Sequence, residues 1–178
     1  MDEEELKSKF FALSATVHPD RAHALPETDR NAAHERYTEL NTAYNCLREP
    51  KERLRHLIEL HTGRKPAQVQ QVPQPLVDIF FQIGQACREA DEFLKRKAAV
   101  TSPLLLAGLF EEGQTISERL TNLRQGLAGQ QRQLLADLKN LNAEWEQDLA
   151  RLETIQQTLS YLQRWQAQLQ ERFVQLAL

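Results

Sequence analysis

The chain has 178 residues, of which 26% are charged, and its formal net charge at pH 7 is −3. This slightly acidic balance argues against a nucleic-acid-binding surface, and no apolar run is long enough to span a bilayer. The acidic N-terminus is the reverse of an export signal, and two widely separated cysteines fit a reducing compartment, so we expect a cytoplasmic protein with no membrane association.

The first predicted element is a helix over 2–17. Leucine, glutamine, glutamate, alanine and arginine are abundant in the chain, and such a composition favours helices throughout. Asp2 is a suitable N-cap, and the glutamates after it suit the positive end of the helix dipole. One apolar stripe is predicted at the positions that repeat every three or four residues: Leu6, Phe10, Leu13 and Val17.

A rigid turn is predicted directly after this helix, in a loop over 18–27. Proline disfavours the α conformation of the residue before it, so the helix should end near His18. The fixed φ of Pro19 stiffens the turn and holds Asp20 outward, where its carboxylate can accept a pair of hydrogen bonds from an arginine of a partner. The imidazole of His18 is a second polar group beside it.

Two further helices follow, over 28–48 and 50–61. Pro50 suits the first turn of the second helix, and Gly63 suits its C-terminal end. The next segment, 64–75, contains three prolines and no apolar period, so we predict a linker between domains. The apolar positions that should line the buried faces of the two helices are Tyr37, Leu40, Ala43, Tyr44, Leu47, Leu54, Leu57 and Ile58.

Beyond the linker, three long amphipathic helices are predicted over 76–98, 103–141 and 143–176. Gly126 and Gly129 should weaken the middle of the second helix, where they could bend or interrupt it. None of the three can bury its apolar face alone, so we expect an antiparallel three-helix bundle. Trp145 and Trp165 are expected in its core. Phe80 and Phe81 are adjacent, so they cannot both face one interior, and at least one of them should be exposed.

The segments around the rigid turn resemble a known family. Phe10–Leu13 before His18–Arg21 looks like helix II and the signature loop of a J-domain, and Leu40–Pro50 looks like helix III. The continuation over 53–63 is similar to the HscB family. The resemblance implies an all-α protein with a truncated J-domain over 1–63, lacking the usual helix I, and a C-terminal bundle over 76–178.

This resemblance implies a co-chaperone that is not itself an enzyme. Such proteins stimulate the ATPase of a DnaK/HscA-type seventy-kilodalton heat-shock chaperone, and they deliver the iron–sulfur scaffold protein IscU to it. The residues expected to contact the chaperone are His18, Pro19, Asp20, Lys7, Lys9 and Arg21. The residues expected to contact the scaffold are Phe80, Phe81, Gln85, Glu89 and Tyr161.

Two other functions remain open from the sequence. One is a general J-protein that recruits a different client. The other is a structural coiled-coil adaptor with an inactive J-like domain, a homodimer through the leucine stripes of 103–176. Metal or cofactor binding is not expected, because no histidines are spaced three or four apart on a helix and no Cys-x-x-Cys occurs.

Overall fold

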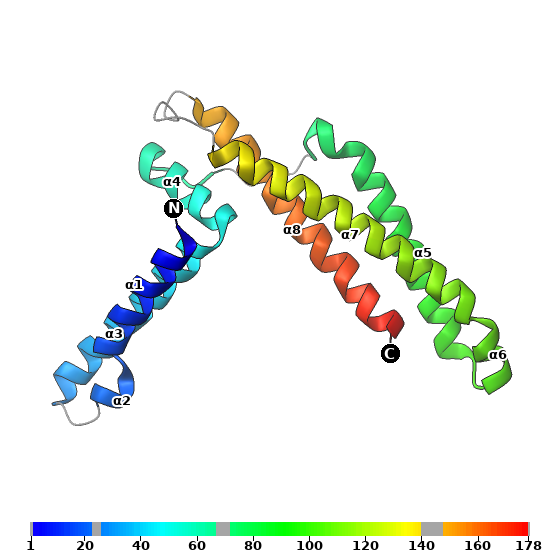
Figure 1. Ribbon diagram of the computed structural model, residues 1–178, viewed down its shortest axis with the longest axis horizontal. Coiled ribbons are helices and arrows are strands. Elements are labelled where there is room, and N and C mark those ends of the chain that lie inside the picture. The colour runs from blue at the N-terminus through cyan, green and yellow to red at the C-terminus, as the bar shows by residue number, and fades with distance from the viewer. Residues whose placement is uncertain (1, 23–25, 67–71, 140–147, 178) are drawn as a thin grey trace. The chain divides into compact units, whose positions relative to one another are not determined.

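The computed structural model describes residues 2–22, 26–66, 72–139 and 148–177. Every regular element in those ranges is a helix, which confirms the predicted all-α class (Figure 1). The chain separates into two compact units, Met1–Pro66 and Ala67–Leu178. Within the described ranges, no helix combines the length and the apolar character that crossing a membrane requires.

In its described residues, 2–22 and 26–66, the N-terminal unit has four helices in chain order. They are α1 (Glu3–Thr16), α2 (Pro19–Ala22), α3 (Glu27–Arg48) and α4 (Pro50–Thr62). Asp2 caps α1 as predicted, because its carboxylate accepts from the backbone N–H groups of Glu4 and Glu5 at 2.9 and 3.3 Å. Gly63 ends α4 with a φ of 68°, the left-handed conformation that glycine adopts without strain.

The helices α1 and α3 lie side by side in this unit (Figure 1). Phe10 of α1 stacks on Tyr44 of α3 with ring centroids 4.2 Å apart, and the guanidinium of Arg48 lies 5.7 Å from the Tyr44 ring. The predicted stripe on α1 is wrong at Leu13, which is 52% exposed, while Ser14 beside it is buried. Phe10 and Ser14 are four residues apart and share one face of α1, and this face contacts α3.

The C-terminal unit begins with a short 3₁₀ turn, η1 (Gln74–Leu76), and continues through α5 (Val77–Ala99), α6 (Pro103–Gly108), α7 (Phe110–Lys139) and α8 (Leu149–Ala177). The single helix predicted over 103–141 is thus two helices, α6 and α7. The break is at Leu109, whose N–H bonds the carbonyl of Leu106 at 3.1 Å. Helix α7 continues through Gly126 and Gly129, so neither glycine interrupts it.

Ion pairs between side chains show that α5 and α7 run antiparallel. Glu89 of α5 pairs with Arg119 of α7. Farther along α5, Arg96 pairs with Glu112, which lies earlier on α7. Charged pairs along this seam fix which turns of the two helices face each other, and so contribute to the register of the bundle.

Helix α8 runs parallel to α5, and a forked ion pair joins them. The Nε atom of Arg172 lies 2.9 Å from Oδ1 of Asp91, and its Nη2 donates to Oδ2 at 2.9 Å. The hydrogen bond to Asp91 raises the pKa of Arg172 above its usual value, so the guanidinium stays charged. Burial raises the pKa of the neighbouring Cys87 thiol, which keeps that thiol protonated.

The core of this unit is formed by the predicted leucine stripes. The largest fully buried side chains in it are Ile83, Leu120, Leu127, Leu162 and Leu169. Trp165 is 4% exposed and belongs to this core, as predicted. Trp145 and Leu141 lie outside the described residues, so the expectation for them stays a prediction.

Two glycines of α7 provide a matched test of helix packing. A Cβ at Gly113 would lie 3.0 Å from Cζ of the buried Phe93, whereas a Cβ at Gly126 would meet no atom within 4 Å. We expect Gly113→Val to lower the free energy of unfolding by about 1–3 kcal/mol more than Gly126→Val, because only the first overpacks the core. Urea unfolding followed by circular dichroism measures the difference. Equal losses would contradict it.

Candidate functional site

The sequence His18-Pro19-Asp20 begins a helical turn, so the loop predicted over 18–27 is partly wrong. Helix α1 ends before it, where the N–H of Val17 bonds the carbonyl of Ser14 at 3.3 Å. Pro19 is the first residue of α2, a position that suits its fixed φ and its missing N–H. The N–H of Arg21 closes the turn by donating to the carbonyl of His18 at 2.9 Å.

The side chains of His18 and Asp20 lie next to each other on this turn. The backbone N–H of Asp20 donates to Nδ1 of His18 at 3.3 Å, and Oδ2 of Asp20 lies 3.6 Å from the same nitrogen. Nδ1 accepts the first contact through its lone pair, and the imidazole proton is then on Nε2. The Asp20 side chain is 84% exposed, so its carboxylate remains accessible to a partner.

Tyr37 of α3 contacts the imidazole of His18 from the side. The two ring centroids are 5.5 Å apart and the rings are at 77°, an edge-to-face arrangement. Sequence reasoning assigned Tyr37 only to a buried stripe and missed this role. The spacing could have indicated this contact, because Tyr37 is seven residues before Tyr44 and lies on the same face of α3, the face that packs on α1.

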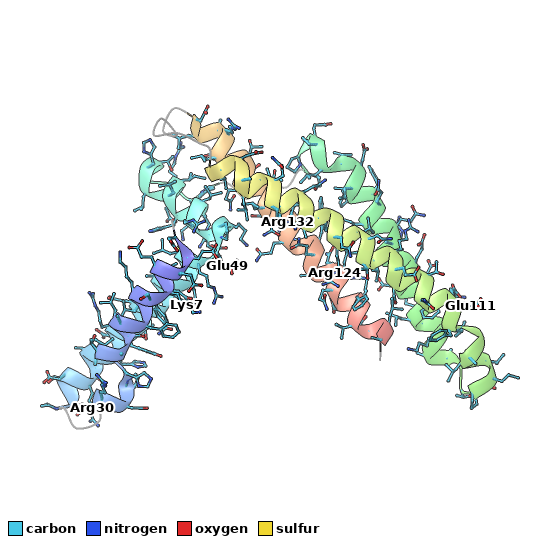
Figure 2. The ribbon with its side chains drawn as sticks, in the orientation of Figure 1. Lys7, Arg30, Glu49, Glu111, Arg124 and Arg132 are labelled. Carbon is cyan, nitrogen blue, oxygen red and sulfur yellow. The ribbon has the colours of Figure 1, made fainter. Side chains whose placement is uncertain are left out.

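The structure does not bring the predicted basic residues of α1 onto one face. Lys7 and Lys9 are two residues apart, which places them about 160° apart around the helix. Lys9 forms an ion pair with Glu5 at 2.7 Å, and this hydrogen bond raises the pKa of Lys9. Lys7, labelled in Figure 2, shares its face with Phe11, which is 58% exposed, and Arg21 is exposed on α2.

A second cluster of interest joins α5 and α8. The ring centroids of Phe80 and Trp165 are 6.1 Å apart, those of Tyr161 and Trp165 are 5.4 Å apart, and Phe80 touches Phe81 at 5.5 Å. Phe80 is 42% and Phe81 65% exposed. We name Phe80, Phe81, Tyr161 and Trp165 the aromatic patch. Trp165 was predicted only as a core residue, yet it connects the two helices of this patch.

Gln85 and Glu89, the other two residues expected at the scaffold surface, do not join the aromatic patch. Nε2 of Gln85 donates to Oε1 of Glu89 at 3.0 Å, and Oε2 of Glu89 accepts from Arg119 of α7. Glu89 is therefore engaged at the seam between α5 and α7. The structure unites Phe80, Phe81 and Tyr161, and it places Glu89 in an ion pair with α7.

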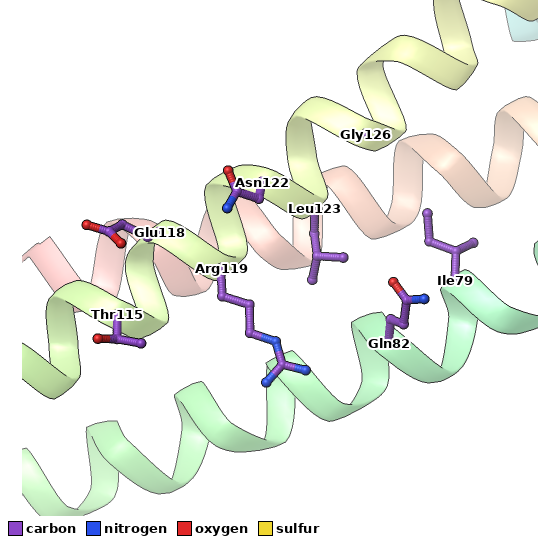
Figure 3. Close-up of a pocket in the computed structure, with 8 residues that line it drawn as sticks. All are labelled: Ile79, Gln82, Thr115, Glu118, Arg119, Asn122, Leu123 and Gly126. Carbon is purple, nitrogen blue, oxygen red and sulfur yellow. The ribbon is translucent and has the colours of Figure 1, made fainter.

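An open groove of about 560 Å³ runs along that seam (Figure 3). Arg119 extends from α7 toward α5, where Ile79 and Gln82 line the other wall. The polar side chains on its walls are Gln82, Thr115, Glu118, Arg119 and Asn122. In the part of the chain that the structure describes, no three His, Cys, Asp or Glu side chains come together to hold a metal ion.

Comparison with known proteins agrees with this geometry. Residues 1–56 match the DnaJ domain family. The Co-chaperone protein HscB homolog of Azoarcus sp. (strain BH72) is 33% identical over 60 residues, which span 34% of this chain and about a third of that relative's length. Chaperone HscB from Vibrio cholerae matches with a TM-score of 0.62 and 20% identity, covering 96% of this chain and 88% of that one. Residues 1–56 therefore match the DnaJ domain family, and the fold of the chain is similar to that of HscB over nearly its whole length.

Proposed function

We propose that the protein is a co-chaperone that stimulates ATP hydrolysis by a DnaK/HscA-type seventy-kilodalton heat-shock chaperone. The observation that carries this proposal is the exposed Asp20 carboxylate beside His18, at the start of α2 and within the match to the DnaJ domain. A carboxylate held on a short, proline-initiated turn is suited to accept a forked pair of hydrogen bonds from an arginine of the ATPase.

Each neighbouring residue has a distinct part in this proposal. Pro19 fixes the backbone of the turn, and His18 adds a polar contact while its Nδ1 receives the N–H of Asp20. Tyr37 is a positioning residue, because its ring packs on the imidazole. Lys7 and Arg21 are exposed cations that would steer an acidic partner surface toward the turn.

The direct test is single-turnover ATP hydrolysis by the cognate chaperone. We expect the rate to rise when the full chain is added and to stay at its basal value with His18→Gln. A chain that leaves the basal rate unchanged would contradict the proposed function. Equal stimulation by His18→Gln and the unmodified chain would contradict the assigned site.

We further propose that the C-terminal unit delivers a client, an IscU-type iron–sulfur scaffold protein, through the aromatic patch. Exposed aromatic side chains dominate the binding energy of many protein interfaces, and Phe81 is 65% exposed. Arg164, whose guanidinium lies 5.5 Å from the Tyr161 ring, adds a charged group at the edge of the patch. Gln85 follows Phe81 by one turn of α5 and adds a polar side chain at the edge of the aromatic patch.

We expect Phe81→Ala to weaken binding of the IscU-type scaffold at least about tenfold, because it removes an exposed aromatic anchor. Calorimetric titration of the scaffold with the full chain measures this. Phe11→Ala is the matched control, since Phe11 is 58% exposed in the other unit and should leave the affinity unchanged. Equal affinities for both variants would remove Phe81 from the interface.

The two alternative functions give different results in the same experiments. A general J-protein would stimulate the chaperone and bind an unfolded model polypeptide, but not the scaffold. An adaptor that dimerised through its leucine stripes would need those leucines on its surface. Leu120 and Leu127 are instead fully buried within one chain, which argues against that arrangement.

A further inference from the structure

Two exposed arginines lie at the edge of the aromatic patch without a carboxylate partner. They are Arg88 of α5 and Arg164 of α8, and neither forms an ion pair with a carboxylate of the described residues. By contrast, Arg119 of α7 and Arg172 of α8 are each paired with a carboxylate of α5. The bundle therefore does not use the charges of Arg88 and Arg164 to hold its helices together, and both guanidiniums are accessible to a partner.

The side chain of Arg88 folds back along α5 toward the aromatic patch. Its Nη1 is the atom that a Cβ on Gly84 would meet, at 3.7 Å, so the guanidinium lies over the preceding turn of the helix. Gly84 follows Phe80 by four residues and Arg88 follows Phe81 by seven, spacings that put each pair on the same side of α5. Because Gly84 carries no side chain, this turn places no bulk between the guanidinium and the rings.

Arg164 borders the aromatic patch from α8. Its guanidinium lies 5.5 Å from the ring centroid of Tyr161, within the range of a cation–π contact. This contact restrains the side chain, while the planar fork of N–H donors matches the two oxygens of a carboxylate. Arginine is enriched among the residues that dominate the binding energy of protein interfaces, as are tyrosine and tryptophan. Arg164 is therefore suited to contact a partner together with the rings.

The carboxylates of α5 on either side of Arg88 are engaged with other helices. Glu89, which the resemblance placed at the scaffold surface, is paired with Arg119 of α7. Asp91 is paired with Arg172 of α8. The two opposite charges of an ion pair largely cancel at the distance of a partner, so these carboxylates do not offset the charge of Arg88.

Other carboxylates lie toward the ends of the two helices. Asp78 is in the first turn of α5, where the positive end of the helix dipole offsets its charge. Glu92 follows the last aromatic residue of the patch on α5 by eleven residues, and on α8 Glu153 and Glu171 lie eight and ten residues from Tyr161. Each of these three separations is about 12 Å or more along a helix, where salt largely screens exposed charges. The edge of the aromatic patch is therefore positively charged.

We infer that Arg88 and Arg164 select a client protein with an acidic surface. The surface that binds here carries carboxylates on either side of an exposed apolar side chain. The apolar side chain packs on Phe81, and the carboxylates accept forked hydrogen bonds from the two guanidiniums. This inference rests on the proposed binding of a client at the aromatic patch, and it adds the charge that the client must carry. A basic surface is rejected, because like charges brought together in an interface weaken binding strongly.

Calorimetric titration of the IscU-type scaffold with the full chain tests the part played by the two arginines. We expect Arg88→Glu and Arg164→Glu each to weaken binding at least about tenfold, and the corresponding lysine variants, which keep the charge, to weaken it less. Arg132→Glu is the matched control, because Arg132 is an exposed arginine of α7 and the change in charge is the same (Figure 2). Circular dichroism shows whether each variant keeps its helical content.

The salt dependence of the affinity is a second measurement. Binding by the unmodified chain should weaken as salt rises from about 50 to 500 mM, because salt screens the attraction between opposite charges. The neutral double variant Arg88→Gln/Arg164→Gln should lose most of this dependence. A dependence that stays the same in the double variant would assign the attraction to other charges and would overturn the inference.

A pair of labelled amphipathic peptides tests the preference without the scaffold. The two peptides share the same leucines and differ only in carrying glutamate or lysine at the polar positions. Fluorescence anisotropy should show tighter binding of the glutamate peptide, and Phe81→Ala and Arg88→Glu should each weaken it. Equal binding of the two peptides, or tighter binding of the lysine peptide, would overturn the inference.

The outcomes separate this inference from the proposed function. Scaffold binding that depends on Phe81 but on neither arginine would overturn the inference and leave the proposed function standing. A scaffold that does not bind at all would contradict the proposed client, and the peptide pair would then decide the charge preference alone. Equal weakening by Arg132→Glu and the two patch variants would assign the effect to net charge and would also overturn the inference.

Discussion

Asp20→Asn is expected to abolish stimulation of the chaperone ATPase while leaving the fold unchanged. The substitution removes the negative charge but keeps the shape of the side chain and the backbone N–H that bonds His18. Because the Asp20 side chain is 84% exposed, the turn does not depend on it for packing. Truncating one partner of a desolvated charge pair costs an interface heavily, so the stimulated rate should fall at least about 100-fold.

Single-turnover ATP hydrolysis at several concentrations of the chain measures this loss. Asp29→Asn is the matched control: Asp29 is an exposed carboxylate in the first turn of α3, and the change in net charge is the same. Unchanged stimulation by Asp20→Asn would show that the exposed carboxylate is not the contact. Equal losses in both variants would assign the effect to overall charge.

Those elements whose signals are local in sequence were predicted well. Helices α1, α3, α4 and α5 were anticipated to within one or two residues, because caps, prolines and apolar periods act over single turns. The break at Leu109 was missed, since Leu106 and Leu109 continue the apolar period across it. Gly126 does not interrupt α7, because the interhelical packing of α7 outweighs the low helix propensity of one glycine.

The candidate site could be predicted only in part, because local sequence signals do not encode the contacts between helices. The local sequence predicted the rigid turn that exposes Asp20 beside His18, and the resemblance supplied Phe80 and Tyr161 as candidate residues. The contact of Tyr37 with His18 depends on how two helices pack, which no local pattern encodes. The same holds for the ion pair that turns Glu89 toward α7, and for the exposure of the leucines in α6.

Trp165→Ala is expected to destabilise the C-terminal unit by about 3–5 kcal/mol, the usual cost of deleting a large buried aromatic side chain. Trp165 is 4% exposed, belongs to the core and also contacts the rings of Phe80 and Tyr161. Its loss would therefore create a cavity and separate the two helices that form the aromatic patch. Trp165→Phe should cost clearly less, because it keeps a ring at this position.

Urea unfolding followed by circular dichroism measures the loss for each variant, and native-state hydrogen exchange locates it. Protection should fall in α5, α7 and α8 but not in α1 and α3, because Trp165 belongs to the core of the C-terminal unit. A cost below about 1 kcal/mol for Trp165→Ala would be typical of a surface substitution and would contradict a core position. Scaffold binding should also fall with Trp165→Ala and recover with Trp165→Phe. That result would show that the ring at this position both supports the bundle and positions Phe80 and Tyr161 for the client.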